Sequence, residues 1–215
     1  MPLFVFLNTT KGLCVMVSRN KKLPVVLNER ERQYLLNQPN PRYLTGFRNR
    51  LTIQIMLNIG LRLAETVDLK WEDIDFLSET LMVREGKGMK DRVLYIKNNN
   101  WRGENDKELL QMWKQRQTEA LLYLPEYVFT TVSKNSAGKK LSDRYIQNMV
   151  VRYGVKASIN KKISPHTLRH TFATDLYRKT KDPVVVKNAL GHSDLSTTMV
   201  YVHLVSGDIE EALSG

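Results

Sequence analysis

From Leu23 onward, apolar residues recur mainly at the spacing of an α-helix, and one segment breaks this period. In the predicted helix 42–58, one apolar stripe is formed by Leu44, Phe47, Leu51 and Ile55. Between residues 80 and 97 the pattern becomes that of two strands, TLMVRE and RVLYIK, joined by the glycine-containing turn GKGMKD. The sequence therefore predicts a mainly α fold with a small antiparallel β-sheet, an α+β fold.

Capping residues and breakers mark the other elements. Asn28 followed by Glu31 predicts a helix start, and Gly60 ends the helix 42–58. Further helices are predicted to begin after Ser142 and Ser164 and to span LAETVDLKW, residues 106–122 and DPVVVKNAL. One more helix is predicted around residues 200–202 and a small one in GDIEEALSG. The segment YVFT is predicted to be a short strand. We expect residues 1–22 to be a leader or linker remnant without assigned function, and residues 23–215 to form one domain.

The charge balance restricts the class of partner. Lys and Arg number 33 against 22 Asp and Glu, a net charge of +11, which favours a polyanion, nucleic acid first and an acidic membrane surface second. Cys14 is the only cysteine, so an intrachain disulfide is excluded and a reducing compartment is expected. No stretch has the length of a membrane span or the layout of a secretory signal. These features predict a cytoplasmic, soluble protein that faces nucleic acid.

The segment SPHTLRH places three basic side chains at the start of a predicted helix. Ser164 is the expected cap and Pro165 the first helical residue, so His166, Arg169 and His170 share one face. A helix N-terminus prefers negative charge, and an external anion would satisfy both the helix and the cations. The structural alternative is a solvated basic turn with one buried histidine.

Three other places put reactive groups beside turns. Arg62 follows Gly60 and could instead form a salt bridge with Glu65. Lys87 lies between glycines in the hairpin turn, where a lysine can simply be solvated. His192 lies in a glycine turn, and Tyr201 follows on a helix where a tyrosine is often part of the core.

The order of these residues resembles the catalytic domain of the tyrosine recombinase, or phage integrase, family. The motifs that carry the resemblance are GLRLAE (60–65), GKGMKDR (86–92), HTLRH (166–170) and LGHSDLSTTMVYVH (190–203). The resemblance extends over about residues 23–213. Ala64 stands where the family often has serine, and Lys90 competes with Lys87 for the lysine position.

The resemblance implies a role for each matching residue. Tyr201 would attack a scissile DNA phosphate to form a 3′-phosphotyrosyl link and a free 5′-hydroxyl. Arg62 and Arg169 would clamp the non-bridging oxygens, and Lys87 would protonate the leaving oxygen. His166 would be a general acid or base near Tyr201, and His192 would hydrogen-bond the phosphate. Beside them, Glu65 would orient Arg62, His170 would make a structural hydrogen bond in the core, and His203 would be a surface residue.

The resemblance also implies how the reaction is organised. It needs neither metal nor ATP, because the phosphotyrosyl link keeps the energy of the broken bond until a second 5′-hydroxyl attacks. The partner would be double-stranded DNA, with a homo-tetramer on two DNA sites during recombination and a monomer without DNA. The segment GDIEEALSG stands where family members carry a tail that docks on a neighbouring protomer, and a simple helical cap is the alternative. The family's N-terminal clamp domain has no counterpart in residues 1–22, so we expect weak, salt-sensitive and poorly selective DNA binding by this chain.

Alternative functions remain for comparison. A type IB topoisomerase shares the tyrosine chemistry, and a DNA-binding relative without catalysis shares the charge. A zinc enzyme using His166 and His170 at i and i+4 is a third possibility, although Arg169 lies between them and the sequence shows no nearby third ligand. The sequence names neither the DNA site nor the biological role, whether dimer resolution, integration or transposition.

Overall fold

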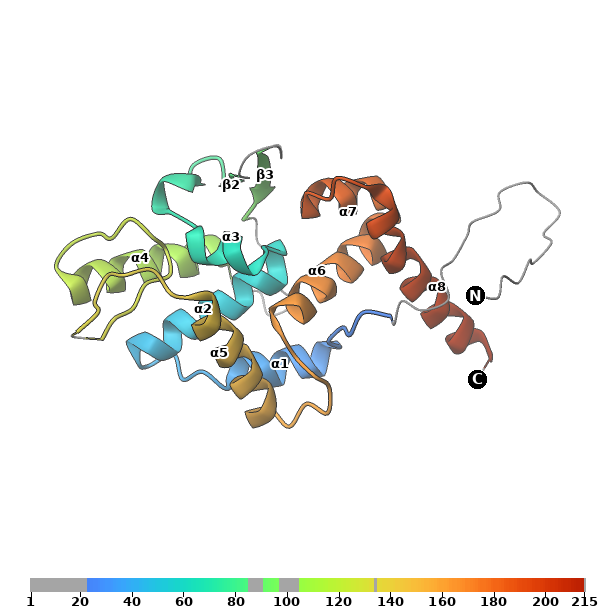
Figure 1. The fold of residues 1–215 in the computed structure, drawn as a ribbon, viewed down its shortest axis with the longest axis horizontal. Coiled ribbons are helices and arrows are strands. Elements are labelled where there is room, and N and C mark those ends of the chain that lie inside the picture. The colour runs from blue at the N-terminus through green and yellow to red at the C-terminus, as the bar shows by residue number, and fades with distance from the viewer. Residues whose placement is uncertain (1–22, 85–90, 97–104, 134, 215) are drawn as a thin grey trace, which may run out of the picture.

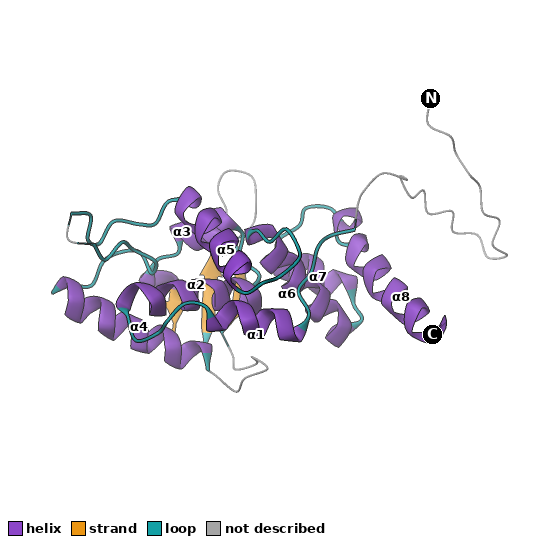
Figure 2. Ribbon diagram, turned by 90° about the horizontal axis from the view of Figure 1, so that it is seen from below, coloured by secondary structure: helices purple, strands orange, loops and turns teal. Residues whose placement is uncertain are grey.

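The computed structural model describes residues 23–84, 91–96, 105–133 and 135–214, with side chains as far as Ser206. Helices dominate this part of the chain, and the strands form one small sheet near the middle of the molecule (Figure 2). The α-helices are α1 (Glu29–Asn37), α2 (Leu44–Ile59), α3 (Leu63–Asp68), α4 (Asp106–Leu121), α5 (Asp143–Lys156), α6 (Pro165–Thr180), α7 (Pro183–Leu190) and α8 (Met199–Ser214). Two short 3₁₀ helices are η1 (Trp71–Asp73) and η2 (Leu195–Thr197), and the strands are β1 (Ile74–Asp75), β2 (Thr80–Val83) and β3 (Arg92–Tyr95). The predicted fold class is confirmed, and the predictions for residues 1–22 lie outside the described residues.

The predicted caps begin the helices where the sequence places them. At the start of α1, the backbone N–H of Asn28 donates to the Glu31 carboxylate at 2.8 Å, and the N–H of Glu31 donates to the Asn28 side chain at 2.9 Å. At the start of α6, Ser164 accepts from the N–H of Thr167 at 3.4 Å, and Pro165 is the first helical residue. These caps fix where the basic motif of α6 begins.

The sheet is antiparallel with strand order β1-β2-β3. Strands β2 and β3 pair in the predicted hairpin, with Leu81 opposite Leu94 and Val83 opposite Arg92. Strand β1 was not predicted, because two residues are too few to show a period. The turn between β2 and β3, which contains Lys87 and Lys90, lies outside the described residues.

The segment Tyr127–Thr130 is not the strand that its apolar run predicts. It pairs through isolated bridges at its two ends. In its buried middle, the carbonyl of Val128 accepts from Trp113 Nε1 at 2.7 Å and from Gln117 Nε2 at 3.2 Å. Side-chain donors from α4 thus satisfy the Val128 carbonyl, whereas the Val128 N–H donates to the carbonyl of Leu69 at 2.9 Å and the Phe129 carbonyl accepts from the N–H of Leu141 at 3.0 Å.

Two clusters of buried side chains lie on either side of α6. The larger one collects side chains from α1 to α5 and the sheet, and it includes Leu168 of α6. The smaller one consists of Ala173, Val186, Leu190 and Tyr201, which come from α6, α7 and α8. Figure 1 shows α7 and α8 on one side of α6 and most of the other helices on the other side. The position of Tyr201 relative to the larger core is therefore set through α6.

Helix α8 continues to Ser214, so the separate acidic helix predicted at GDIEEALSG is wrong. That segment contains no proline, and one glycine inside a helix costs only about 1 kcal/mol. The helix that carries Tyr201 and the C-terminal segment are therefore one element.

Gly60 ends α2 as predicted, in the left-handed conformation with φ of 73°. A Cβ atom at this position would lie 2.1 Å from Cδ1 of Phe172 on α6. Only glycine therefore allows both the turn and the close approach of α2 to α6.

Candidate active site

Arg169 connects elements from the two sides of α6. The residue is 6% exposed; its Nη1 donates to the carbonyl of Gly60 at 2.7 Å, and its Nη2 donates to the carbonyl of Leu190 at 2.5 Å. Burial lowers the pKa of Arg169 to about 10, and repulsion from the Arg62 guanidinium acts in the same direction. The side chain is still positively charged at neutral pH, and it is fixed between the end of α2 and the end of α7.

Glu65 joins Arg169 to two further arginines. Its Oε1 accepts from Arg62 Nη1 at 2.7 Å and from Arg92 Nη1 at 3.0 Å, while its Oε2 accepts from Arg92 Nη2 at 2.8 Å. Nη1 of Arg169 lies 3.7 Å from the same Oε2. Burial by itself would raise the pKa of Glu65, but hydrogen bonds from Arg92 and Arg62 outweigh it and lower this pKa. One carboxylate cannot neutralise three guanidinium groups, so these four side chains together keep a surplus of positive charge.

Three consecutive carbonyl groups at the end of α7 each accept a hydrogen bond from a different arginine. The pairs are Arg92 Nε with Ala189 at 3.0 Å, Arg169 Nη2 with Leu190 at 2.5 Å, and Arg62 Nη2 with Gly191 at 2.6 Å. The last carbonyls of a helix have no partner within the helix and carry partial negative charge, so they suit cationic donors. The end of α7 therefore sets the spacing of the three guanidinium groups.

His192 follows this turn and contacts two threonine hydroxyls. Its Nδ1 lies 3.0 Å from Oγ1 of Thr198 and 3.0 Å from Oγ1 of Thr197. Burial, together with the positive charges of Arg169 and Arg62, lowers the pKa of His192 to about 4. The ring is therefore neutral at pH 7. With Nδ1 accepting from a threonine, Nε2 carries the proton and can donate to an anion.

Tyr201 lies on α8 with its ring in the smaller core and its hydroxyl paired. The residue is 2% exposed, and its Oη lies 2.9 Å from Nδ1 of His170. Burial raises the pKa of Tyr201, whereas the positive charge of Arg169 acts in the opposite direction. The phenol is therefore protonated at neutral pH, and it needs a proton acceptor before it can act as a nucleophile.

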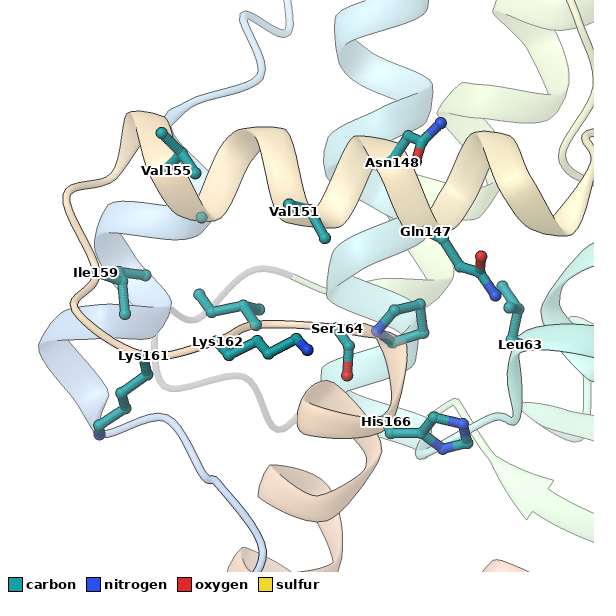
Figure 3. A pocket seen from close by; sticks show the side chains of 13 residues that line it. Leu63, Gln147, Asn148, Val151, Val155, Ile159, Lys161, Lys162, Ser164 and His166 are labelled. Carbon is teal, nitrogen blue, oxygen red and sulfur yellow. The ribbon is translucent and has the colours of Figure 1, made fainter.

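His166 occupies a different environment from His170. It is exposed and lies at the edge of a groove of about 490 Å³ between α5 and the loop that precedes α6 (Figure 3). Val151 and Val155 of α5 line one side of the groove, and Lys162 lies in the loop opposite (Figure 3). The ring centroids of His166 and His170 are 6.5 Å apart. The imidazole within hydrogen-bonding distance of Tyr201 is that of His170, whereas His166 borders the groove.

The structure thus brings together Arg62, Glu65, Arg169, His170, His192 and Tyr201. Lys87 lies outside the described residues, and His203 is exposed as expected. Arg92 and Thr198 were not singled out from the sequence. Arg92 ends the motif GKGMKDR, and a cation at the start of the otherwise apolar strand RVLY is the signal that could have drawn attention to it.

Among the described residues, no group of three or more His, Cys, Asp or Glu side chains is placed so that it could hold a metal ion. In the same part of the chain, no helix has the length and apolar character needed to cross a membrane.

The sequence matches the family model of the phage integrase family over residues 26–206. Tyrosine recombinase XerD of Staphylococcus saprophyticus is 34% identical over 192 residues, which cover 89% of this chain and 62% of that protein. Tyrosine recombinase XerD of Staphylococcus aureus strain Mu50 is 35% identical with the same coverage. The chain therefore spans less than two thirds of the length of these curated relatives.

Solved structures show the same fold. The crystal structure of XerA recombinase superposes with a TM-score of 0.73 at 28% identity, covering 90% of this chain and 65% of that chain. The XerH site-specific recombinase bound to a palindromic difH substrate, in a post-cleavage complex, gives a TM-score of 0.73 at 31% identity and covers 90% of this chain and 53% of that one.

Proposed function

Because this chain belongs to the phage integrase family of tyrosine recombinases, we propose that it is the catalytic part of a site-specific DNA recombinase or integrase. In this proposal the chain cleaves and rejoins DNA strands through a 3′-phosphotyrosyl intermediate, and residues 23–215 form the catalytic domain. Residues 1–22 are a leader or linker. The proposal is supported by a relative named as a tyrosine recombinase, XerD, which is 34% identical to this chain. It is also supported by the DNA-bound site-specific recombinase XerH, which is 31% identical.

The observation that carries the proposal is the convergence of a buried tyrosine with a cluster of fixed positive charge. Arg62, Arg92 and Arg169 surround Glu65 with a surplus of positive charge, and the neutral His192 stands next to them. Tyr201 is close enough to Arg169 for that charge to affect its pKa. A nucleophile beside fixed cations and a neutral donor suits the in-line displacement of a phosphodiester.

We assign the steps to these side chains as follows. Tyr201 Oη attacks the phosphorus, while Arg62 and Arg169 hydrogen-bond the non-bridging oxygens and stabilise the extra charge of the five-coordinate transition state. His192 donates from Nε2 to a phosphate oxygen. Lys87 supplies the proton to the departing 5′-oxygen, and His166, at the groove edge, is placed for acid or base chemistry on substrate that lies in the groove. The reaction needs neither metal nor ATP, because each cleavage is reversed by attack of a 5′-hydroxyl.

The same proposal covers the partners. The substrate is double-stranded DNA, two sites are exchanged by four copies of the chain, and a single copy is monomeric without DNA. The net charge of +11 supports a polyanionic partner. The setting is cytoplasmic and prokaryotic, where the protein acts on DNA.

The experiment is covalent trapping on a nicked duplex that carries candidate sites, in EDTA, with the wild type and with Tyr201→Phe. We expect a covalent protein–DNA product from the wild type and none from the variant, because phenylalanine keeps the ring in the small core but removes the nucleophile. A product from both proteins would place the nucleophile elsewhere. Relaxation of supercoiled DNA without strand exchange would favour the topoisomerase alternative.

A further inference from the structure

The structure gives the nucleophilic oxygen of Tyr201 an imidazole partner that the sequence analysis placed elsewhere. We propose that His170 is the base that receives the phenolic proton when Tyr201 attacks, and that it is therefore a catalytic residue. This inference rests on the proposed function and deepens it, because it identifies the route of one proton in the reaction.

The contact geometry separates the two histidines of α6. Nδ1 of His170 lies 2.9 Å from Oη of Tyr201, and the two ring centroids are 5.8 Å apart. His166 lies one helical turn earlier, is exposed, and borders the groove beside Lys162 (Figure 3). A general base has to reach the proton that it removes, and in this structure His170 does so directly.

The protonation state of His170 suits a proton acceptor. The charged or titratable groups that face it are His166 and Arg169 on its own helix, His192 after α7, and Tyr201 on α8. Burial lowers the pKa of His170, and the charges of His166 and Arg169 lower it further. The ring is therefore neutral at pH 7, and Nδ1 can accept the Tyr201 O–H while Nε2 carries the ring proton.

The pKa of His170 is lowered and that of Tyr201 is raised, so proton transfer before attack is unfavourable. The transfer becomes favourable as the new oxygen–phosphorus bond forms, because an ester oxygen is far less basic than a phenolate. The bound phosphate anion also favours the imidazolium form of His170. We therefore place the transfer in the same step as the attack on phosphorus.

The step balances as follows. The Oη–H bond of Tyr201 breaks, and the proton passes to Nδ1 of His170. The Oη electron pair forms the bond to phosphorus, the bond from phosphorus to the 5′-oxygen breaks, and that oxygen takes a proton from the Lys87 ammonium. Rejoining reverses each transfer, so His170 returns the proton to Tyr201.

The position of His170 within α6 couples this base to the phosphate clamp. His170 directly follows Arg169, whose guanidinium bridges the ends of α2 and α7. The hydroxyl of Thr174 donates to the His170 carbonyl at 2.9 Å, one turn further along the helix. Because both residues lie on one helix, the base and the clamp keep their separation when DNA binds.

The first test uses nicked duplexes that differ in one bridging atom, oxygen or sulfur, at the 5′ side of the scissile phosphate. A thiolate leaves without protonation, so sulfur restores variants that lack the general acid but not variants that lack the base. His170→Gln should slow covalent product formation by roughly 10²–10⁴-fold on both duplexes. Lys87→Ala is the matched control and should be slow only on the oxygen duplex.

The outcomes separate this inference from the proposed function. If the wild type forms no covalent product, the proposed function is overturned, and so is the role of His170 as proton acceptor. If the wild type cleaves and His170→Gln cleaves equally fast, or recovers on the sulfur duplex, only the role of His170 is overturned. Thermal unfolding and binding of an uncleavable duplex show whether the variant is folded.

A second measurement needs no DNA. The chain has four histidines, so their ring nitrogens can be followed by NMR after ¹⁵N-histidine labelling and assigned with single His→Gln variants. Replacing Tyr201 by Phe should move the Nδ1 signal of His170 and leave the exposed His203 unchanged. An unchanged His170 signal would show that the pair does not form in solution and would contradict the proposal.

Discussion

At the scale of single residues, the side chain of Arg92 is held by contacts with elements outside its own strand. It donates two hydrogen bonds to Glu65 and one to the carbonyl of Ala189, and its side chain is 8% exposed. Through Glu65 it fixes Arg62, and through the end of α7 it fixes the turn that precedes His192. Arg92 therefore helps to position the arginines that we propose as the phosphate clamp.

We expect Arg92→Ala to destabilise the chain by about 3 kcal/mol, near the lower end for a broken buried ion pair because Arg62 still donates to Glu65. Arg92→Lys should fold better but lose roughly tenfold or more in cleavage rate, since lysine cannot make the paired contact to the carboxylate. Denaturant unfolding and single-turnover cleavage measure the two effects. Equal cleavage by Arg92→Lys and the wild type would remove the positioning role.

His192 gives a pH dependence of stability whose sign follows from its lowered pKa. The unfolded chain binds a proton on His192 near pH 6.5, whereas the folded chain binds it near pH 4. Stability from this group is therefore complete above pH 6.5 and is lost as the pH falls through about 4. We expect the melting temperature of the wild type to fall in this window, and His192→Gln to fall less.

The control for that titration is His203→Gln, which changes an exposed histidine and should leave the wild-type slope unaltered. Melting temperatures taken at half-unit steps from pH 4 to 7 would decide the question. Parallel curves for the wild type and His192→Gln would mean that His192 does not provide the proton uptake.

At the scale of elements, the helix ends carry the site. The end of α2 supplies the Gly60 carbonyl, the end of α7 supplies three successive carbonyls, and the start of α6 supplies Arg169. Carbonyls at helix ends lack partners within the helix, so they are available to orient guanidinium groups. The arginines of the proposed clamp are thus oriented by backbone groups, which side-chain substitutions do not remove directly.

Gly60→Ala should test this use of a helix end. The added Cβ would meet Phe172 at 2.1 Å in a backbone with φ of 73°, so we expect a loss of roughly 2–4 kcal/mol. Because the Gly60 carbonyl accepts from Arg169, cleavage by the folded fraction should also fall.

Gly138→Ala is the matched control. Gly138 has φ of 79°, and its nearest neighbour is the hydroxyl of Tyr123, a half-exposed side chain that can move away. The control should cost only about 1–2 kcal/mol and leave cleavage unchanged. If Gly60→Ala also left cleavage unchanged in the folded protein, the carbonyl of Gly60 would not be needed to orient Arg169.

At the scale of the whole molecule, the excess of positive charge should dominate DNA affinity. With a net charge of +11, we expect the logarithm of the binding constant to fall linearly with the logarithm of salt concentration, with a slope of about 0.9 per phosphate contact. Lys162→Ala, at the groove beside His166, should reduce the slope by about 1. Lys107→Ala, whose ammonium pairs with Glu79 at 3.2 Å, should not change it.

Fluorescence anisotropy of a labelled duplex between 50 and 300 mM salt measures these slopes. Binding that is insensitive to salt would contradict an interface made mainly of phosphate contacts. An unchanged slope for Lys162→Ala would place the DNA away from the groove.

Tyr201 and the arginines of the site pack against different parts of the molecule. Its ring belongs to the smaller cluster with Ala173, Val186 and Leu190, whereas the arginines and Glu65 lie where α2, α3 and β3 meet α6 and α7. Tyr201 thus packs in the smaller cluster, and the arginines are joined to that cluster through the end of α7.

The sequence alone determined most of the helices, their caps, the hairpin and the order of the reactive residues, because capping bonds and apolar periods act within a few positions of the chain. The capping pair Asn28 and Glu31 and the helix start at Ser164 are examples. Only the tertiary structure decided that Arg92 hydrogen-bonds Glu65, that carbonyls at the end of α7 accept from three arginines, and that His170 contacts Tyr201. These contacts join residues 27, 97 and 31 positions apart, and such separations leave no period in the sequence because they arise only when whole elements pack together.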